Sequence, residues 1–227
     1  MKKLILVLLL ALIPGLSFAG SHNVGVTMAK VQGGTYLFDW DAETDTANLS
    51  SGTVQATVNG DPTLSTDYAA SPTQSLKATG SYDYYRFTAN AYNPLGGVIR
   101  LKLYSNYTLV GSSARALTIY GNTSNSIEVY HTTTDRVVFA YKLTGTILYA
   151  ISSNNTMLSG QWNDIALTYS QNGGATDWSL AINGSAAGSG SMAGVWDSGV
   201  TPARIDVGAT TGTVPVNPLY IDDVRVE

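Results

Sequence analysis

Residues 160–170 read GQWNDIALTYS, and this stretch decides the fold class. After Trp162, the apolar residues Ile165, Leu167 and Tyr169 alternate with polar ones. A period of two residues is typical of a β-strand that buries one face. A tryptophan at the start of such a strand is expected to pack between two sheets, because its large ring is seldom left in water.

The same alternation recurs on both sides of this stretch. Downstream, residues 177–184 end in Asn183-Gly184, a pair that adopts positive φ and closes tight hairpins. Further alternating runs, separated by Gly, Asn, Asp, Ser and Pro, lie at 35–40, 51–58, 74–80, 82–90, 96–105, 114–121, 126–132, 136–143, 146–152, 203–209 and 219–226. The four runs from 114 to 152 are expected to form a meander, and 182–202 is expected to be one long Gly/Ser/Ala-rich loop. About a dozen short strands without helical periodicity predict an all-β, antiparallel two-sheet jelly-roll sandwich.

The order of these motifs resembles the concanavalin A-like lectin/glucanase superfamily, specifically its laminin G-like jelly-roll domains. The resemblance rests on four segments in succession, GQWNDIALTYS, DWSLAING, ARIDVGA and LYIDDVRV. It is specific over residues 160–226 and generic over 35–159. Such a fold hosts many functions, so the function needs evidence from the residues themselves.

The first 19 residues have the pattern of a secretory signal peptide. Lys2 and Lys3 precede an apolar run, and Ser17-Phe18-Ala19 supplies the small residues that cleavage requires. Residues 20–34 show no sustained period and are expected to be a flexible lead-in. Residues 35–227 are then one jelly-roll domain, exported from a bacterial or phage-infected cell, with no integral membrane segment left after cleavage.

Charge and amino-acid composition restrict the classes of molecule that this protein is expected to bind. The chain has a net charge of −4, and loss of Lys2 and Lys3 with the signal peptide lowers it by two, to −6. No basic surface is expected to neutralise phosphates, which excludes nucleic acid as a partner. Cysteine is absent, so disulfides and thiol chemistry are excluded. Only 12% of the residues are charged, which leaves the polar, weakly charged surface that is common among extracellular glycan-binding proteins.

Two aspartates, Asp222 and Asp223, interrupt the last predicted strand. Alternation places one of them on each face, and an unpaired carboxylate among apolar neighbours is costly. Three arrangements avoid this cost. A β-bulge turns both acids outward, Arg225 or Arg204 pairs with one of them, or a hard cation such as calcium binds them.

A second acidic cluster, FDWDAETD, places Asp39, Asp41, Glu43 and Asp45 after the first strand. The first and last strands of jelly-roll domains commonly pair, so the resemblance implies a structural calcium ion held by Asp39, Asp41, Asp222 and Asp223. Zinc is not expected, because the only histidines, His22 and His131, lie far apart and no cysteine accompanies them.

No catalytic pair stands out. The family's hydrolases carry a Glu-x-Asp-x-x-Glu strand, and this chain has no such segment. Glu128 lacks a carboxylate nearby in sequence, and His131 and Asp135 lack a Gly-x-Ser-x-Gly turn. The segment VYHT leaves a lyase-type set open. The prediction is that this protein is not a polysaccharide hydrolase or lyase.

Sugar binding is easier to support, because aromatic faces stack on pyranose rings. Tyr104, Tyr120 and Tyr130 each lie on the polar side of an alternating strand, and they would project together if their strands shared the concave sheet. Trp196 lies in the predicted long loop, where it is expected to be exposed. The alternative to sugar binding is a structural role, in which the tyrosines are present because they favour strands and Trp196 covers the edge of a sheet.

The sequence therefore predicts a secreted, non-catalytic, glycan-binding protein that acts at a cell or particle surface. The alternative is a structural subunit of an extracellular filament, a surface layer or a virion, in which the partners are other copies of the chain. An exterior rich in Thr, Ser and Asn suits lateral packing of this kind.

Overall fold

The computed structural model describes residues 38–43, 57–70, 73–80, 82–88, 95–104, 113–132, 134, 136–152, 157–208 and 218–227. By internal contacts the chain divides into Met1–Gly33 and Gly34–Glu227, and every described residue belongs to the second unit. The predictions for 1–19 and 20–34, for much of the runs at 35–40 and 51–58, and for His22, Asp45 and Asp135 lie outside the described residues. No helix with the length and apolarity to cross a membrane occurs within these ranges.

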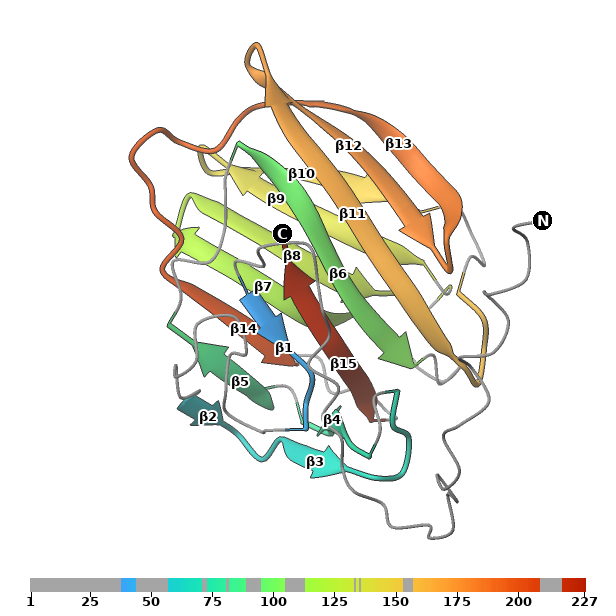
Figure 1. Ribbon diagram of the computed structural model, residues 1–227. Helices are drawn as coiled ribbons and strands as arrows, with labels where there is room; N and C mark the ends of the chain where they lie inside the picture. The colour runs from blue at the N-terminus through green and yellow to red at the C-terminus, as the bar shows by residue number, and fades with distance from the viewer. Residues whose placement is uncertain are drawn as a thin grey trace, which may run out of the picture. The chain divides into compact units, whose positions relative to one another are not determined.

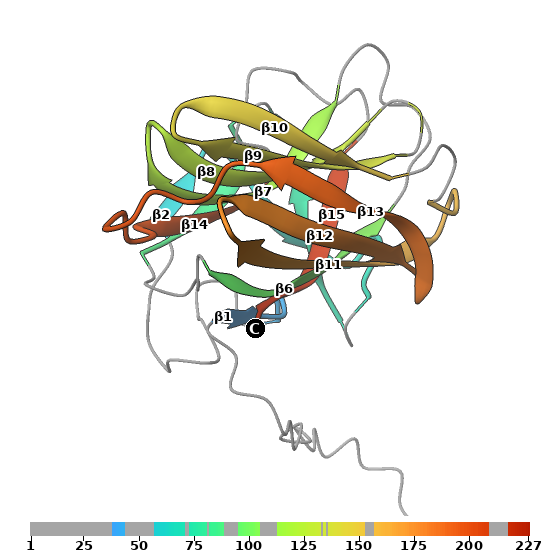
Figure 2. The same cartoon turned by 90° about the horizontal axis from the view of Figure 1, so that it is seen from above.

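The alternating runs form strands that pair antiparallel in two sheets, and Figure 2 shows these sheets as separate layers. Sheet A runs β13 (Ser185–Ala193), β12 (Ala175–Ile182), β11 (Trp162–Asn172), β6 (Gly96–Tyr104), β15 (Leu219–Val226), β4 (Ser75–Ala78) and β3 (Thr63–Ser65), with β1 (Phe38–Trp40) also paired to β15 (Figure 1). Sheet B runs β10 (Thr146–Ile151), β9 (Val137–Leu143), β8 (Asn125–His131), β7 (Ala114–Asn122), β14 (Arg204–Gly208), β5 (Tyr84–Phe87) and β2 (Thr57–Asn59). The all-β, two-sheet prediction is confirmed, and so is the meander, as β7 to β10.

The core lies between the two sheets. On β11, Ile165, Leu167 and Tyr169 all face it and are buried, as their alternation predicts. Phe38 of sheet A meets Phe87 of sheet B edge to face, with ring centroids 5.1 Å apart. Burying a large apolar side chain completely stabilises a fold by about 1.5–3 kcal/mol, so these inward positions dominate its stability.

The predicted loop at 182–202 is wrong in its first half, because β13 occupies Ser185–Ala193. Its sequence, SAAGSGSMA, lacks the large alternating side chains by which strands are recognised. The structure gives the reason for the small residues. A Cβ on Gly188 or on Gly190 would lie 3.3 Å from the Trp178 indole of the neighbouring strand, so the glycines let that ring pack against the edge strand.

The first and last strands pair as expected, and β1 lies against the end of β15. The register between β15 and β6 shifts between Asp222 and Arg225, which is a β-bulge, and Asp223 takes a φ of 52°. Of the three arrangements weighed for the two aspartates, two are therefore present: the bulge, and an ion pair between Arg225 and Asp223. The bulge does not turn both acids outward, because Asp222 remains fully buried.

Candidate functional site

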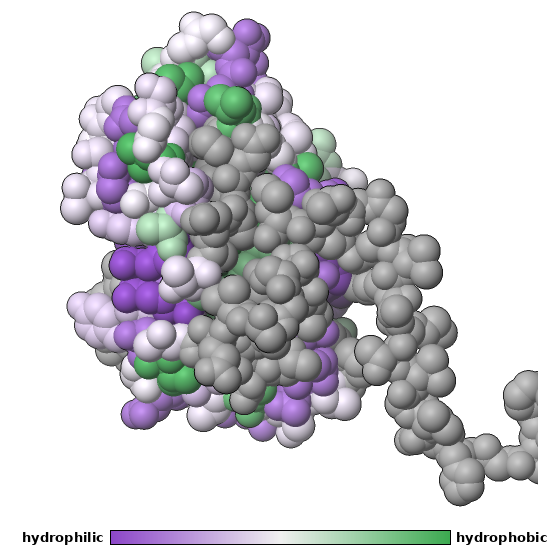
Figure 3. Space-filling model, turned by 60° about the vertical axis from the view of Figure 1, so that its left-hand side comes forward, coloured by the Kyte–Doolittle hydropathy of each residue, from purple (hydrophilic) through white to green (hydrophobic). Residues whose placement is uncertain are grey.

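Polar side chains and separate apolar patches share the surface in Figure 3. A functional site must be sought where side chains of one kind gather, and this happens on the outer face of each sheet. The two outer faces carry different chemistry.

Four aromatic residues on the outer side of sheet A form an aromatic shelf, defined here as Tyr104, Trp162 and Tyr220 from its strands and Tyr68 from the connection between β3 and β4. Tyr220, Tyr104 and Trp162 are direct cross-strand partners on β15, β6 and β11. Tyr104 meets Trp162 edge to face at 5.6 Å and Tyr220 at 6.0 Å. Aromatic pairs at these separations contribute about 0.5–1.5 kcal/mol beyond their buried area.

Tyr68 covers this row. Its ring stacks on Tyr104 with centroids 4.1 Å apart, and it meets Tyr220 edge to face at 5.0 Å. Tyr68 is 39% exposed, so part of its ring remains open to solvent while Tyr104 supports it from beneath. Burial, together with the neighbouring Tyr68, raises the pKa of Tyr104 above its ordinary value, which already keeps a tyrosine hydroxyl protonated at neutral pH.

Two charged residues border the shelf. Lys77 Nζ lies 2.6 Å from Asp67 Oδ2 and 5.9 Å from the centre of the Tyr220 ring. The Tyr220 hydroxyl donates to the same carboxylate oxygen over 3.4 Å. The hydrogen bond from Lys77 is the main reason that the pKa of Asp67 is lowered. The shelf therefore has an apolar face with hydrogen-bonding groups at its edge.

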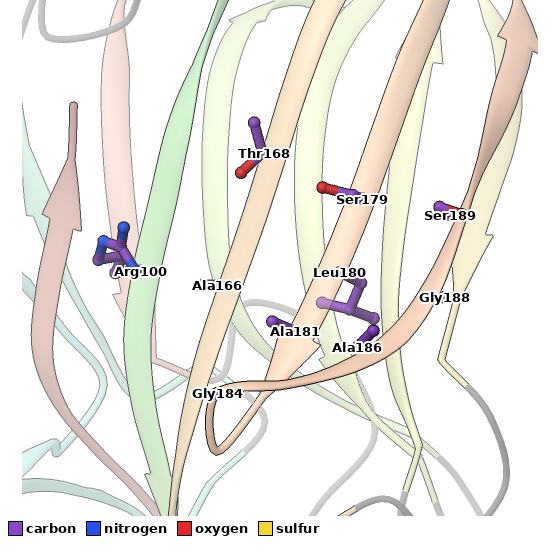
Figure 4. A pocket seen from close by; sticks show the side chains of 10 residues that line it. All are labelled: Arg100, Ala166, Thr168, Ser179, Leu180, Ala181, Gly184, Ala186, Gly188 and Ser189. Carbon is purple, nitrogen blue, oxygen red and sulfur yellow. The ribbon is translucent and has the colours of Figure 1, made fainter.

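A shallow cavity of about 590 Å³ opens on the same outer face, a size typical of small-ligand sites. Figure 4 shows the residues that line it, which are Arg100, Ala166, Thr168, Ser179, Leu180, Ala181, Gly184, Ala186, Gly188 and Ser189. Arg100 is the one charged member of this set. Since Arg100 and Tyr104 share a face of β6 four residues apart, the cavity lies roughly 13 Å from the shelf along that strand.

The outer face of sheet B carries arginine–tyrosine pairs instead. Each guanidinium lies over a tyrosine ring within cation–π distance. The three pairs are Arg86 with Tyr84 at 5.1 Å, Arg115 with Tyr130 at 5.2 Å and Arg204 with Tyr120 at 4.2 Å.

Two carboxylates balance most of this charge. Asp206 is buried and accepts hydrogen bonds from Arg86 Nε at 2.8 Å and Nη2 at 3.0 Å. These hydrogen bonds raise the pKa of Arg86 further. Arg115 Nη2 lies 2.8 Å from Glu128 Oε2. Burial, helped by a hydrogen bond to Glu128, raises the pKa of Tyr130 to about 12, so Tyr130 is not a general base at neutral pH.

Glu128 and His131 do not form a catalytic pair. Glu128 lies on the outer face of β8, whereas His131 is buried and alternates with it onto the inner face. The lyase-type interpretation of VYHT would use Tyr130 and His131, and these neighbours on β8 point to opposite faces, Tyr130 outward and His131 inward.

The three predicted sugar-binding tyrosines are not brought together. Tyr104 lies on sheet A, while Tyr120 and Tyr130 lie on sheet B. The expectation that they project from one sheet is wrong, because the chain changes sheets between β6 and β7. Each is half-buried, and each contacts a different partner.

Trp196 is not exposed, contrary to expectation. Only 4% of it is accessible, and its Nε1 donates to the Val200 carbonyl over 2.7 Å. Gly121 makes room for the ring, since a Cβ there would lie 2.4 Å from it. The loop folds this tryptophan into the core, so its ring is not available for stacking on a sugar.

The acids predicted to hold calcium are divided among other partners. Arg225 contacts both Asp39, at 3.2 Å, and Asp223. Asp222 accepts hydrogen bonds from the Asp223 amide at 2.8 Å and the Ala70 amide at 3.2 Å. Asp41 accepts from the amide of Glu43 at 3.1 Å. Across the described ranges, no three His, Cys, Asp or Glu side chains lie close enough to hold a metal ion.

Sequence reasoning missed most of the shelf. Trp162 was expected in the core, yet it is half-buried on the outer face, opposite Tyr104. Strict alternation from Ile165 already places Trp162 on the polar face, so a signal was available. Tyr68 lies in a segment without periodicity, and nothing in the sequence links it to Tyr104.

Comparison with known proteins gives a consistent picture of the fold. No curated protein matches the sequence. The solved structures that match include the receptor binding domain of botulinum neurotoxin C/D mosaic serotype, with a TM-score of 0.68 and 13% identity over 85% of this chain and 47% of that one. The chain thus spans about half the length of the neurotoxin binding domains that it matches.

Two shorter structures match over nearly their whole length. One is Domain 4 of AbnA, a GH43 extracellular arabinanase from Geobacillus stearothermophilus, in complex with arabinotriose, with a TM-score of 0.61, 14% identity, and 85% and 91% of the two chains covered. The other is the carbohydrate esterase vb_24B_21 from Shiga toxin-encoding bacteriophage phi24B, with a TM-score of 0.56, 15% identity, and 85% and 97% covered. At these identities the likeness shows the fold alone.

The family model for the concanavalin A-like lectin/glucanases superfamily, in its laminin G-like form, matches residues 79–227. The match begins well before the region in which the sequence motifs are specific, and it covers more than half of the chain. This protein therefore belongs to the concanavalin A-like lectin/glucanase superfamily.

Proposed function

We propose that this protein is a secreted, non-catalytic glycan-binding protein and that the aromatic shelf of sheet A is its sugar-stacking surface. The observation that carries the proposal is Tyr68, which is 39% exposed while Tyr104 stacks beneath it at 4.1 Å. A ring held in this way loses little conformational freedom when a ligand stacks on it, which favours binding.

The surroundings of the shelf suit a sugar. Lys77, Asp67 and the Tyr220 hydroxyl offer both donors and acceptors at its edge. Farther along the sheet, the cavity presents the hydroxyls of Thr168, Ser179 and Ser189. A saccharide of several units that stacks on the shelf would reach this cavity, since the two lie roughly 13 Å apart.

The structural neighbours support carbohydrate as the ligand class. One of the matched domains is in complex with arabinotriose, and another match concerns a botulinum neurotoxin whose cell entry depends on two ganglioside molecules. The neighbours include an extracellular arabinanase domain, which agrees with the export signal proposed for residues 1–19. Opposite orientations of Glu128 and His131 favour binding without catalysis.

The test uses the mature chain, residues 20–227, against a panel of polysaccharides by affinity electrophoresis. Tyr68→Ala removes the exposed ring and is expected to weaken binding roughly ten- to a hundredfold, the cost of one aromatic stacking contact of about 1–3 kcal/mol. Tyr82→Ala is the matched control, because Tyr82 is 60% exposed but lies outside the shelf. Equal affinities for the two variants would contradict the proposal.

Absence of catalysis is tested on the same panel. We expect no new reducing ends and no unsaturated products from any polysaccharide that the protein binds. Product release that disappears in Glu128→Gln would overturn the non-catalytic assignment.

Self-assembly is the second candidate function, and β10 favours it. Ile147, Tyr149 and Ile151 lie on one face of this terminal strand of sheet B and are 50%, 57% and 43% exposed. Exposed apolar strand faces promote association between copies. Sedimentation of the mature chain as large particles, dispersed by Tyr149→Lys but not by Tyr82→Lys, would favour a structural subunit. A monomer would exclude it.

A further inference from the structure

One row of side chains crosses the outer face of sheet B. The register places Lys142 of β9, Ser126 of β8, Tyr120 of β7 and Arg204 of β14 opposite one another on four adjacent strands. Lys142 and Arg204 are the two cations of the row, three strand spacings apart, and beyond Lys142 the register continues to Ile147 of β10. At about 4.8 Å a spacing, their backbone positions are roughly 14 Å from each other.

Arg204 is held in place but has donors to spare. Its guanidinium lies 4.2 Å from the centre of the Tyr120 ring, which fixes the plane of the group. Its Nε is buried without a hydrogen-bond partner, although Asp206 Oδ2 lies 3.3 Å away. That carboxylate already accepts two hydrogen bonds from Arg86. The Arg204 side chain is 33% exposed, so the terminal nitrogens of this fixed guanidinium, and not the buried Nε, can donate to an oxyanion supplied from outside.

The charge on this face points to the same ligand. Its strands present four cations, Arg86, Arg115, Lys142 and Arg204, against two acids, Asp206 and Glu128. Lys142 makes no ion pair or hydrogen bond within the described part of the chain. The face is therefore cationic on a chain whose net charge is −4. Such a local excess attracts anions in spite of the overall charge.

We propose that the outer face of sheet B binds the carboxylate groups of an acidic oligosaccharide, with Arg204 taking one carboxylate and Lys142 another. Tyr120, between them in the row, offers the part of its surface that Arg204 leaves uncovered to the sugar that joins the two acidic groups. The inference rests on the proposed function only in that the ligand is a saccharide. Its site lies on sheet B, whereas the aromatic shelf lies on sheet A. An experiment can therefore contradict one of the two proposals without contradicting the other.

The probes are hexamers of galacturonate, glucuronate and mannuronate, each measured by calorimetry beside its fully methyl-esterified form. The ester keeps the sugar and removes the charge. We expect at least one acidic hexamer to bind, its ester to bind at least tenfold more weakly, and rising salt to weaken only the acidic form. No binding of any hexamer, or equal binding of acid and ester, overturns the proposal.

Variants locate the site. Arg204→Gln is expected to weaken binding of the acidic hexamer at least tenfold, and Lys142→Gln several-fold. Lys102→Gln, a cation removed from sheet A, leaves the affinity unchanged. Lys142 packs against no carboxylate, so its variant tests the site even if Arg204→Gln fails to fold. Unchanged affinity in Lys142→Gln together with a folded, fully binding Arg204→Gln overturns the proposal.

Two further measurements test whether the ligand is a saccharide or an acidic peptide, and whether it binds to sheet B or to sheet A. Polyglutamate that binds as tightly as the uronate hexamer would replace the saccharide with an acidic peptide and overturn the ligand class. Tyr68→Ala separates this site from the shelf. Loss of neutral-glycan binding with retained uronate binding supports both sites, whereas loss of uronate binding in Tyr68→Ala places the acidic ligand on sheet A and overturns the assignment to sheet B.

Discussion

The outer faces of the two sheets are built from the same residue types and still differ in what they offer. On sheet A every strand cation is paired with a carboxylate, as in Lys77 with Asp67 and Arg225 with Asp39. Its aromatic rings contact one another. On sheet B the tyrosines contact arginines, and two buried or half-buried carboxylates are shared among them.

Register explains the difference. Tyr220, Tyr104 and Trp162 are direct cross-strand partners, so their rings meet ring to ring. On sheet B, Tyr120 is opposite Arg204 and Tyr130 is opposite Arg115, so each ring meets a guanidinium. Cross-strand pairs are the unit from which a sheet surface is made. The pairing therefore yields a neutral stacking surface on one sheet and a cationic one on the other.

The largest expected effect compares one ion pair from each face. Asp206→Asn leaves Arg86 and Arg204 without their shared carboxylate, and we expect the free energy of unfolding to fall by about 2–4 kcal/mol, somewhat less than for a fully buried pair, because both arginines are partly exposed. Asp67→Asn breaks an exposed pair with Lys77 and should cause no resolvable change. Urea denaturation of both variants measures this. Equal losses of unfolding free energy in the two variants would contradict the difference between the two faces.

The next effect concerns Asp83, in the connection between β4 of sheet A and β5 of sheet B. Burial raises the pKa of Asp83, but hydrogen bonds from the amides of Asp61, Gly80 and Thr79 outweigh burial and lower it. A depressed pKa stabilises the fold above the unfolded value of about 3.9, and this contribution is lost as pH falls through the folded pKa. We expect Asp83→Asn to cost about 1–2 kcal/mol at pH 6.

The control for Asp83→Asn is a comparison of wild type and variant at acidic pH. As pH falls from about 4 toward 2, the difference in stability between wild type and variant should shrink, since the wild-type carboxylate becomes protonated. Melting temperatures across this range provide the measurement. A difference that stays constant with pH would show that the charge of Asp83 does not stabilise the fold.

A smaller effect tests structural calcium, which remains a prediction. Arg225 already neutralises Asp39 and Asp223, so a calcium ion would depend mainly on Asp41 and Asp222. At a calcium concentration ten times the Kd of the site, the ion would stabilise the fold by about 1.4 kcal/mol and raise Tm by roughly 3–5 °C. Thermal unfolding with calcium and with a chelator measures it. The rise should vanish in Asp222→Asn or Asp41→Asn, and no rise in wild type would exclude the ion.

The sequence predicted the strands better than the surfaces. Alternation located β6 to β12 and β15 closely, because a buried face forces a period of two. It missed the short β3, and it missed β13, in which the Trp178 ring explains why Gly188 and Gly190 carry no side chain. Alternation predicts a strand from its large side chains. It therefore fails for β13, where the ring of a neighbouring strand leaves no room for them.

The candidate sites were harder to predict, for two physical reasons. Alternation gives the face of a residue within its strand but not the sheet to which that strand belongs, so Tyr104 was grouped with Tyr120 and Tyr130. Composition suggested that a tryptophan in a Gly-rich loop would be exposed, whereas Gly121 and the Val200 carbonyl form a buried place for Trp196. Both errors concern tertiary contacts that no local pattern contains.

Tryptophan fluorescence during a glycan titration tests the central claim most directly. Of the four tryptophans, Trp162 belongs to the aromatic shelf, whereas Trp178 packs against the glycines of β13. We predict that the polysaccharide selected by affinity electrophoresis changes the emission of wild type and of Trp178→Phe, and that the change is lost in Trp162→Phe. A change that persists undiminished in Trp162→Phe would contradict glycan binding at the shelf.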